Sequence, residues 1–286
     1  MTAQKADFTD VYVQPDPRAY YRTLARLDYE IPEHGCPVFR AVIDELREPG
    51  SAPTVLDLCC SYGVNAALLN HDLALADVSR HYEEISDTAM SRAELLDVDR
   101  EWYAARRRAD AVDVVGLDIS GPAVRYAVEA GLLASGIVAD LETEPLHDAD
   151  AAKLAGVDLI TVTGGIGYVN ERTFEQIYDA ADEAPWVAAL SLRWIDFEPV
   201  AETLASQGLV TERVDGFVVP QRRVADQDEH RFVLSELEAR GVEPIPAELS
   251  GTHCAALYVA RPAGAAAESP VTAIVDGLQG LPLGVE

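Results

Sequence analysis

The feature that most constrains the fold is an alternation of short apolar segments with helical patterns through the middle of the chain. The apolar segments have the composition of buried strands and lie at 54–58, 112–117, 136–139, 157–163 and 186–192. The helical patterns lie at 64–70, 121–133, 171–183 and 198–207. Strands that alternate with helices form right-handed βαβ units, whose parallel sheet is covered by helices on both faces. The alternation therefore predicts a doubly wound α/β fold.

The strand–helix alternation does not continue into the last third of the chain. Two strand-like segments, 209–219 and 255–260, flank a charged helical pattern at 227–240. Because no further βα unit follows, we expect these two strands to form an antiparallel pair at one edge of the sheet. The full prediction is a Rossmann-like, mostly parallel seven-stranded sheet with an antiparallel terminal strand pair.

The region before the first strand is predicted to be helical. Residues 1–50 form this segment, which we expect to cover the ligand site, with breaks near Ile31-Pro32 and at 35–37. A linker rich in Pro and Gly follows, and residues 51–262 then form the ligand-binding domain.

Two further segments lie outside the βα rhythm. Residues 72–110 are predicted to be a helical insertion that caps the ligand end of the sheet, because a structureless loop of that length is unusual. The tail, 263–286, is rich in Ala, Gly and Pro and is expected to be loosely ordered or docked through Val275 and Leu278.

The charge balance limits the class of partner. The 286 residues include 22 Lys and Arg against 49 Asp and Glu, a net charge of −27. Proteins that bind polynucleotides need clustered cations, and we interpret the one basic run, 106–108, as a solvated helix face. No apolar run approaches the ~20 residues that span a bilayer, and residues 1–10 lack the pattern of a signal peptide. We expect a cytoplasmic protein with a small-molecule partner, no nucleic acid and no membrane, either a monomer or a homodimer.

The four cysteines, Cys36, Cys59, Cys60 and Cys254, do not have the spacing of a metal site. We therefore predict no bound metal and reduced, mostly buried thiols. A nucleophilic Cys60 is the alternative interpretation.

Acidic and small residues follow successive predicted strands. Asp57 lies in the first strand and Gly63 in the loop after it, Asp118 ends the second strand, Asp140 ends the third, and a glycine-rich segment, 163–168, follows the fourth. In open α/β sheets ligands bind at the carboxyl ends of the strands. An acid at the second strand end can accept both hydroxyls of a ribose, and an acid at the third can accept an adenine amino group.

This order resembles the class I S-adenosylmethionine-dependent methyltransferases over about 54–192. The resemblance implies S-adenosylmethionine as cofactor, with the first-strand acid and its loop at the amino-acid end, the second-strand acid at the ribose, and the acid after the third strand at adenine. It also implies that the loop after the fourth strand lies beside the methyl group. The cofactor-binding residues that it implies are Asp57, Cys59, Ser61, Gly63, Asp118, Ile119, Asp140, Leu141 and Gly164.

The sequence departs from the family pattern in two ways. Two positions of the loop that are usually glycine are Cys59 and Ser61 here. Asp118 lies 61 positions after Asp57 (118 − 57), whereas about twenty separate such residues in a minimal domain. Asp77 has the shorter spacing and is the alternative ribose ligand, although its neighbours are typical of a helix start.

The methyl acceptor is expected to contact the segments that surround the cofactor. We predict catalytic roles for His34, in the N-terminal segment, and for Tyr168, after the fourth strand; His81 is an alternative base. The predicted acceptor-binding residues are Tyr20, Tyr21, His81, Tyr82 and Trp194.

Taken with the resemblance, the sequence predicts in-line methyl transfer to an oxygen or nitrogen of a small molecule. The alternative is a non-catalytic protein that binds S-adenosylmethionine or S-adenosylhomocysteine. A nicotinamide-dependent dehydrogenase is disfavoured, because the first strand is not followed by G-x-G-x-x-G.

Overall fold

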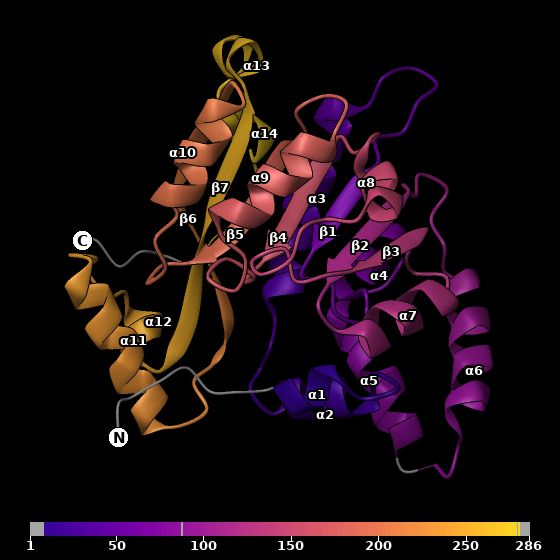
Figure 1. The fold of residues 1–286 in the computed structure, drawn as a ribbon. Helices are drawn as coiled ribbons and strands as arrows, with labels where there is room; N and C mark the ends of the chain where they lie inside the picture. Colours follow the sequence, from indigo (N-terminus) through magenta and orange to yellow (C-terminus); the bar gives the residue numbers. More distant parts are fainter. Residues whose placement is uncertain (1–8, 87, 279, 281–286) are drawn as a thin grey trace.

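A seven-stranded sheet with the order β3-β2-β1-β4-β5-β7-β6 forms the centre of the computed structural model, which describes residues 9–86, 88–278 and 280 (Figure 1). Strands β1 to β5 run parallel, whereas β7 lies antiparallel between β5 and β6. The strands are β1 (Val55–Leu58), β2 (Val114–Asp118), β3 (Ser135–Val138), β4 (Leu159–Thr163), β5 (Trp186–Leu192), β6 (Leu209–Arg223) and β7 (Thr252–Pro262). The predicted fold is confirmed. The strand order reverses between β1 and β4, where doubly wound sheets bind their ligands.

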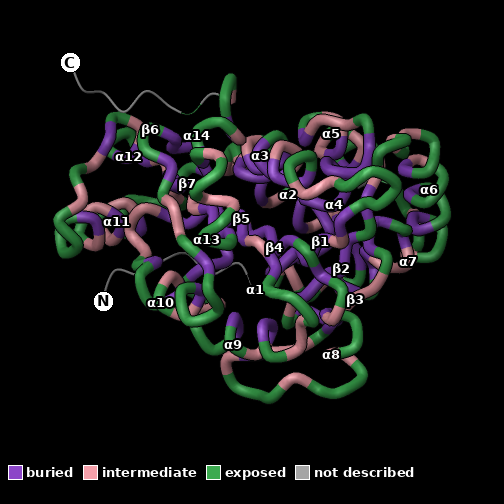
Figure 2. The backbone as a smooth tube through the Cα atoms, turned by 90° about the horizontal axis from the view of Figure 1, so that it is seen from above, coloured by how far each residue is buried: buried purple, intermediate pink, exposed green. Residues whose placement is uncertain are grey.

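Helices cover both faces of the sheet (Figures 1 and 2). On one face lie α3 (Ile31–Leu46), α4 (Val64–Asn70) and α7 (Gly121–Glu129); on the other lie α8 (Asp148–Leu154), α9 (Glu171–Ala180) and α10 (Glu198–Ser206). Strand side chains alternate between these two cores: Val55 points to the first, and Leu56 and Leu58 point to the second. The buried residues lie mostly in the strands and on the helix sides that face them (Figure 2).

The N-terminal segment forms α1 (Thr9–Tyr12) and α2 (Arg18–Ala25), which lie across the carboxyl edge of the sheet (Figure 1). The predicted break near Ile31-Pro32 matches the gap between α2, which ends at Ala25, and α3, which begins at Ile31, whereas the predicted break at 35–37 is wrong because α3 runs through Pro37. Pro32 lies in the first turn, where its missing N–H has no partner in a helix anyway. Pro37 lies inside the helix, next to the fully buried Val38 and Phe39, and burial of that apolar face stabilises the helix despite the lost hydrogen bond.

The insertion is helical, as predicted, and forms α5 (Leu75–Ser86) and α6 (Arg92–Ala104). It packs beside α2 and α7 instead of lying over the strand ends (Figure 1). The rings of Tyr21 and Tyr82 stack there at 4.5 Å. A third apolar core joins these helices, so the insertion supports α2 from the side.

The C-terminal region adds α11 (Gln227–Ala239), α12 (Pro246–Leu249), α13 (Ala263–Glu268) and α14 (Val271–Ile274). Val275 is buried and Leu278 packs against the core on the α3 side of the sheet. The tail is therefore docked through these two residues, the second of the two forms expected for it. Residues 279 and 281–286 of the predicted tail lie outside the described residues, as do residues 1–8 of the N-terminal segment. Within the described ranges, no helix has both the length and the apolar character needed to cross a membrane.

Candidate active site

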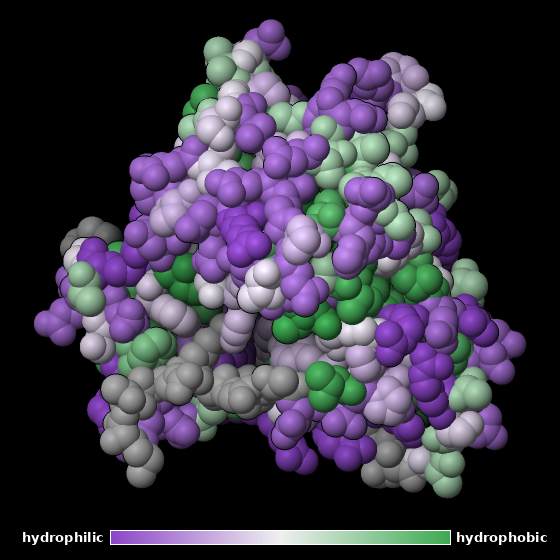
Figure 3. All heavy atoms as spheres, in the orientation of Figure 1, coloured by the Kyte–Doolittle hydropathy of each residue, from purple (hydrophilic) through white to green (hydrophobic). Residues whose placement is uncertain are grey.

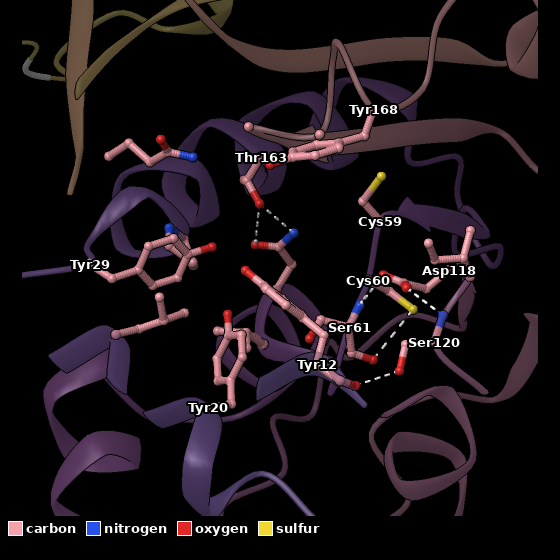
Figure 4. Close-up of a pocket in the computed structure, with 18 of the residues that line it drawn as sticks. Tyr12, Tyr20, Tyr29, Cys59, Cys60, Ser61, Asp118, Ser120, Thr163 and Tyr168 are labelled. Carbon is pink, nitrogen blue, oxygen red and sulfur yellow. Dashed lines mark hydrogen bonds between the residues drawn. The ribbon is translucent and has the colours of Figure 1, made fainter. Parts of the chain in front are cut away.

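A cavity of about 410 Å³ lies between the carboxyl ends of β1, β2 and β4 and the N-terminal helices (Figure 4). One side, which we call the strand-end wall, consists of residues 59–61, 118–120 and 163–165. The opposite side, the lid wall, consists of Tyr12, Tyr20, Tyr29, Gln221 and Arg222. Hydrophobic side chains gather above α1 on a face that is otherwise mostly hydrophilic (Figure 3).

The loop after β1 has a backbone conformation that glycine adopts most easily. Cys59, Ser61 and Gly63 have φ angles of 61°, 49° and 76°. This left-handed region costs a residue with a side chain roughly 1–2 kcal/mol. Cys59 and Ser61 thus keep a glycine-like conformation without being glycine, and such strain is typically found at functional sites.

Asp118 ends β2 and is held by two backbone groups. Its Oδ1 accepts a hydrogen bond from the Ser120 N–H at 2.8 Å, and its Oδ2 accepts one from the Ser61 N–H at 2.9 Å. Burial raises the pKa of Asp118, although these N–H groups partly oppose the rise. Each carboxylate oxygen has a second lone pair, so the fixed side chain can accept two more hydrogen bonds from the cavity.

Asp77, the alternative to Asp118, lies in the first turn of α5 outside the cavity. Its carboxylate accepts a hydrogen bond from the Ala74 N–H at 3.0 Å and pairs with Arg80 at 3.2 Å. These contacts are those of a helix-capping residue.

A row of polar side chains leads from the lid wall to Asp57, which lies behind the cavity. Tyr29 is hydrogen-bonded to Tyr20 and to Thr163. The Asn65 Nδ2 group donates to Thr163 Oγ1 at 3.1 Å and to Asp57 Oδ1 at 2.8 Å. Asp57 Oδ2 has no partner among the described residues, and burial raises the pKa of this carboxyl group to about 7. Asp57 therefore contacts the cavity only through Asn65 and Thr163.

Backbone carbonyl groups of the N-terminal segment attach it to the loops after β1 and β2. The Ser120 hydroxyl donates to the Tyr12 carbonyl at 2.5 Å, and the Tyr62 hydroxyl donates to the Gln14 carbonyl at 2.8 Å. The Tyr20 ring lies edge-on to Tyr12 at 5.5 Å and to Tyr29 at 6.3 Å. In Figure 4 these three rings face the strand-end wall across the cavity. Burial raises the pKa of Tyr29 to about 12, so that its hydroxyl is neutral at pH 7.

The structure brings about half of the predicted site residues to the cavity. Among the predicted cofactor residues, those that line it are Cys59, Ser61, Asp118, Ile119 and Gly164. Among the predicted acceptor and catalytic residues, Tyr20 and Tyr168 line it. Ile119 and Tyr168 are 71% and 62% exposed, which places them at the rim.

The other predicted cofactor residues lie away from the cavity. Gly63 begins α4 and packs near Ala127. Leu141 is a core residue. Asp140 accepts hydrogen bonds from the Glu142 N–H and the Thr143 hydroxyl in its own turn. Contact of Asp140 or Leu141 with adenine remains a prediction.

The predicted residues outside the lid and strand-end walls have other partners. His34 pairs with Glu30 at 3.4 Å and is not among the residues that line the cavity. Trp194 lies against His253. The remaining three belong to the core that joins α2 to the insertion: Tyr21, His81 and Tyr82. No described residue of 72–110 lines the cavity, so the expectation that the insertion caps it is not met, because its apolar side chains pack against α2, α4 and α7 instead.

Sequence reasoning did not identify several residues that line the cavity: Tyr12, Tyr29, Asn65, Gln221 and Arg222. The segment of β6 that contains Gln221 and Arg222 was predicted to lie beyond the end of a strand. Its one sequence signal was Pro220, which interrupts the apolar pattern and is typical of an edge strand or a bulge.

Arg222 is paired within the protein. Its guanidinium donates to Glu229 Oε1 at 2.7 Å and Oε2 at 3.0 Å, and Glu229 also lies 3.3 Å from His253. No group of three or more His, Cys, Asp or Glu side chains among the described residues has the arrangement of a metal site.

No protein-family model and no curated protein sequence matches this chain. Several solved structures are similar. The TehB-like SAM-dependent methyltransferase from Corynebacterium glutamicum is 15% identical, covers 84% of this chain and 93% of its own, and has a TM-score of 0.41. The plantazolicin methyltransferase BpumL, solved with SAH, is 10% identical over 88% of this chain and 96% of its own, with a TM-score of 0.42. The O-methyltransferase from a trans-AT PKS multienzyme of Brevibacillus brevis, also solved with SAH, is 13% identical over 96% of this chain and 84% of its own, with a TM-score of 0.38.

These likenesses are distant, and the strand order is the stronger observation. Five parallel strands in the order 3-2-1-4-5 are followed by an antiparallel strand placed between the fifth and the sixth. The chain therefore has the Rossmann-like fold expected from its resemblance to the class I S-adenosylmethionine-dependent methyltransferases.

Proposed function

We propose that the protein is an S-adenosylmethionine-dependent methyltransferase that acts on an oxygen or nitrogen atom of a small molecule. The observation that supports this most is the Asp118 carboxyl group, fixed by the Ser61 and Ser120 N–H groups where the strand order reverses. A carboxylate that is held in this way can accept two adjacent hydroxyls, which is what a ribose presents.

The residues on the strand-end wall fit the cofactor along its length. Asp118 would accept the ribose hydroxyls on its remaining lone pairs. Ile119, largely exposed beside it, offers an apolar surface to adenine. Ser61 is 5% exposed, and its hydroxyl has no partner among the described residues. This hydroxyl and the adjacent loop backbone would bind the polar amino-acid end.

When bound, the cofactor supplies a methyl group on a positively charged sulfur, and the protein contributes positioning and exclusion of water. Gly164 has a φ of 68° and no side chain, so its backbone lines the β4 end of the cavity directly and the Gln221 amide packs against it. The tyrosines of the lid wall cover the opposite side. No histidine or glutamate of the described chain lines the cavity, so the proposal uses no side-chain base, and a proton lost by the acceptor passes to solvent.

Calorimetric titration tests this proposal. S-adenosylmethionine and S-adenosylhomocysteine should each bind with a Kd of about 1 μM to 1 mM, the range of enzyme ligands. NAD⁺ is the matched control nucleotide and should give no saturable heat. Absence of binding by S-adenosylhomocysteine to protein that melts cooperatively would contradict the proposal.

A binding protein that holds the cofactor without transferring its methyl group is the second candidate. The absence of histidine and glutamate from the described residues that line the cavity favours it, because some acceptors need a proton removed. Formation of S-adenosylhomocysteine during incubation with a metabolite panel separates the two functions. Product with any acceptor identifies an enzyme.

A further inference from the structure

Gln221 enters the cavity from an irregular position in β6. In the pairing of β6 with β7, Pro220 lies opposite Cys254 and Arg222 lies opposite His253, so Gln221 is an extra residue in the ladder. Such bulges turn a side chain away from the regular alternation and occur often beside active sites. The Gln221 carbonyl accepts a hydrogen bond from the Glu30 N–H at 2.8 Å, which ties the bulge to the start of α3.

The Gln221 amide lies next to the β4 loop. A β-carbon placed on Gly164 would lie 2.2 Å from Gln221 Nε2, so the amide occupies the space that any side chain at position 164 would need. Gln221 is 6% exposed, and its Oε1 has no hydrogen-bond partner among the described residues. A buried amide oxygen without a partner costs roughly 1–3 kcal/mol, and a ligand that donates to it removes this cost.

The lid-wall groups beside this amide carry no net charge. Arg222, its neighbour, is neutralised by the two hydrogen bonds to Glu229. The hydroxyls of Tyr20 and Tyr29 are neutral at pH 7, as tyrosine hydroxyls ordinarily are, and burial raises the pKa of both groups further. Burying a ligand charge against such a wall would leave that charge without a partner. The rings of Tyr12, Tyr20 and Tyr29 instead offer apolar faces and edges that suit a flat molecule.

From these observations we infer that Gln221 is a specificity-determining residue for the methyl acceptor, and that this acceptor is an uncharged, planar molecule with an N–H or O–H group that donates to the Gln221 amide oxygen. The inference rests on the proposed function for the identity of the cavity as an acceptor site. Recognition of the donor itself does not depend on methyl transfer.

Four probes of one shape test the inference in the presence of S-adenosylhomocysteine. They are 2-naphthol, which is uncharged and can donate; 2-methoxynaphthalene, which is uncharged and cannot; 2-naphthoate, an anion; and 2-naphthylmethylammonium, a cation. Saturation-transfer NMR and calorimetry would measure binding to the wild type, to Gln221→Leu and to Gln221→Glu. Gln207→Leu, the same change at an exposed position of α10's C-terminal end, is the matched control.

We expect 2-naphthol to bind the wild type most tightly and Gln221→Leu to weaken it about tenfold, with 2-methoxynaphthalene changed less than about twofold. Gln221→Glu should shift the preference toward the ammonium probe, a change that a purely structural role would not produce. Three results would overturn the inference: tightest binding of either charged probe by the wild type, failure of 2-naphthol to bind, or equal losses of 2-naphthol and 2-methoxynaphthalene in Gln221→Leu. Failure of the proposed function would be recognised separately, as absence of heat with S-adenosylhomocysteine alone.

Discussion

The two walls of the cavity are built in different ways. The strand-end wall consists of backbone segments that directly follow β1, β2 and β4, and its geometry is set by N–H groups, such as those of Ser61 and Ser120 on Asp118. The lid wall consists of side chains from α1, α2, the connection between α2 and α3, and the β6 bulge, which lies far from the other three in the sequence. Its tyrosines are held by packing against each other and, through Tyr21 and Tyr82, against the insertion.

The position of the strand-end wall is therefore set by the sheet, whereas the position of the lid wall is set by side-chain packing. A parallel sheet places the ends of neighbouring strands at one edge, whatever surrounds it. No comparable rule positions the lid wall. The helices that pack against α2 are α5 and α6, and none of their described residues lines the cavity. We expect mutations in the insertion to affect stability first and mutations at the strand ends to affect the ligand first.

The largest effect is expected at Asp99, which is fully buried in α6. Its carboxylate accepts hydrogen bonds from the hydroxyls of Tyr82 and Tyr126, both at 2.6 Å, and contacts His81 at 2.7 Å. Asp99→Ala should lower the free energy of unfolding by about 3–5 kcal/mol, because the buried hydroxyls of Tyr82 and Tyr126 and the half-buried His81 ring each lose a hydrogen bond. Chemical denaturation followed by circular dichroism measures this loss.

Asp97→Ala is the matched control for Asp99, since Asp97 is exposed on the same helix and pairs with Arg100 on the surface. It should change stability by less than about 0.5 kcal/mol. Equal stability of the two variants would show that the insertion does not depend on the Asp99 cluster. If Asp99→Ala stays folded but binds S-adenosylhomocysteine more than tenfold more weakly, the insertion also affects the ligand, and the two parts of the site are not independent.

Asp57→Asn tests how the Asp57 carboxyl group, which lies behind the strand-end wall, makes the stability of the protein depend on pH. The pKa of Asp57 is raised in the folded state from 3.8 to about 7, so the folded protein binds this proton more tightly than the unfolded chain does. The stability that this group contributes is complete below about pH 4 and is lost as the pH rises through 7. Asparagine stays neutral, so the stability of Asp57→Asn relative to the wild type should increase by about 2–4 kcal/mol between pH 4 and pH 7. Urea denaturation at several pH values measures the difference, and parallel curves for the two proteins would refute it.

Asp118→Ala and Asp77→Ala together test which of the two carboxylates binds the ribose, the one on the strand-end wall or the one in the insertion. The loss of two charge-assisted hydrogen bonds to ribose should weaken S-adenosylhomocysteine by about 2–3 kcal/mol, or 30- to 150-fold. Asp77→Ala should leave the affinity within about twofold and lower stability by roughly 1 kcal/mol through the lost helix cap. Calorimetry and thermal melts of both variants provide the test. The reverse order of affinities would assign the ribose to Asp77.

The smallest effect is expected from relieving strain in the loop after β1. Ser61→Gly should raise the free energy of unfolding by about 0.5–1 kcal/mol relative to Ser61→Ala, because only glycine adopts the φ of 49° without cost. Both variants lose the hydroxyl, so both should weaken S-adenosylhomocysteine to the same extent. Equal melting temperatures for the glycine and alanine variants would mean that this loop is not strained.

The sequence allowed the sheet to be predicted because buried strands are continuous apolar runs. The last two strands are longer than predicted: β6 continues to Arg223, where the prediction stopped at 219, and β7 spans Thr252–Pro262, where 255–260 was predicted. Gln221 and Arg222 are polar but buried, and apart from Pro220 nothing in the local pattern indicates that a bulge turns them inward. Part of the strand-end wall was predicted because its residues end or directly follow the strands: Cys59, Ser61, Asp118, Ile119 and Gly164.

The N-terminal segment, which contributes the tyrosines of the lid wall, could not be predicted in the same way. α3 continues through Pro37 because the core stabilises it, an effect that local propensity does not contain. Tyr21 and Tyr82 were expected to contact the acceptor, yet they stack on each other in the core between α2 and α5. An aromatic residue at helical spacing has the same sequence signal whether it lines a cavity or fills a core, so only the tertiary structure distinguishes Tyr20 from Tyr21.

A crystal structure with S-adenosylhomocysteine tests the central claim most directly, namely that the strand-end wall binds the cofactor while the lid wall is left for the acceptor. The account predicts density for the ligand with both ribose hydroxyls within hydrogen-bonding distance of Asp118, adenine against Ile119, and the thioether facing Gly164, with the Gln221 amide not in contact with the ligand. Density for the ribose at Asp77, or for the ligand outside the cavity, would contradict it.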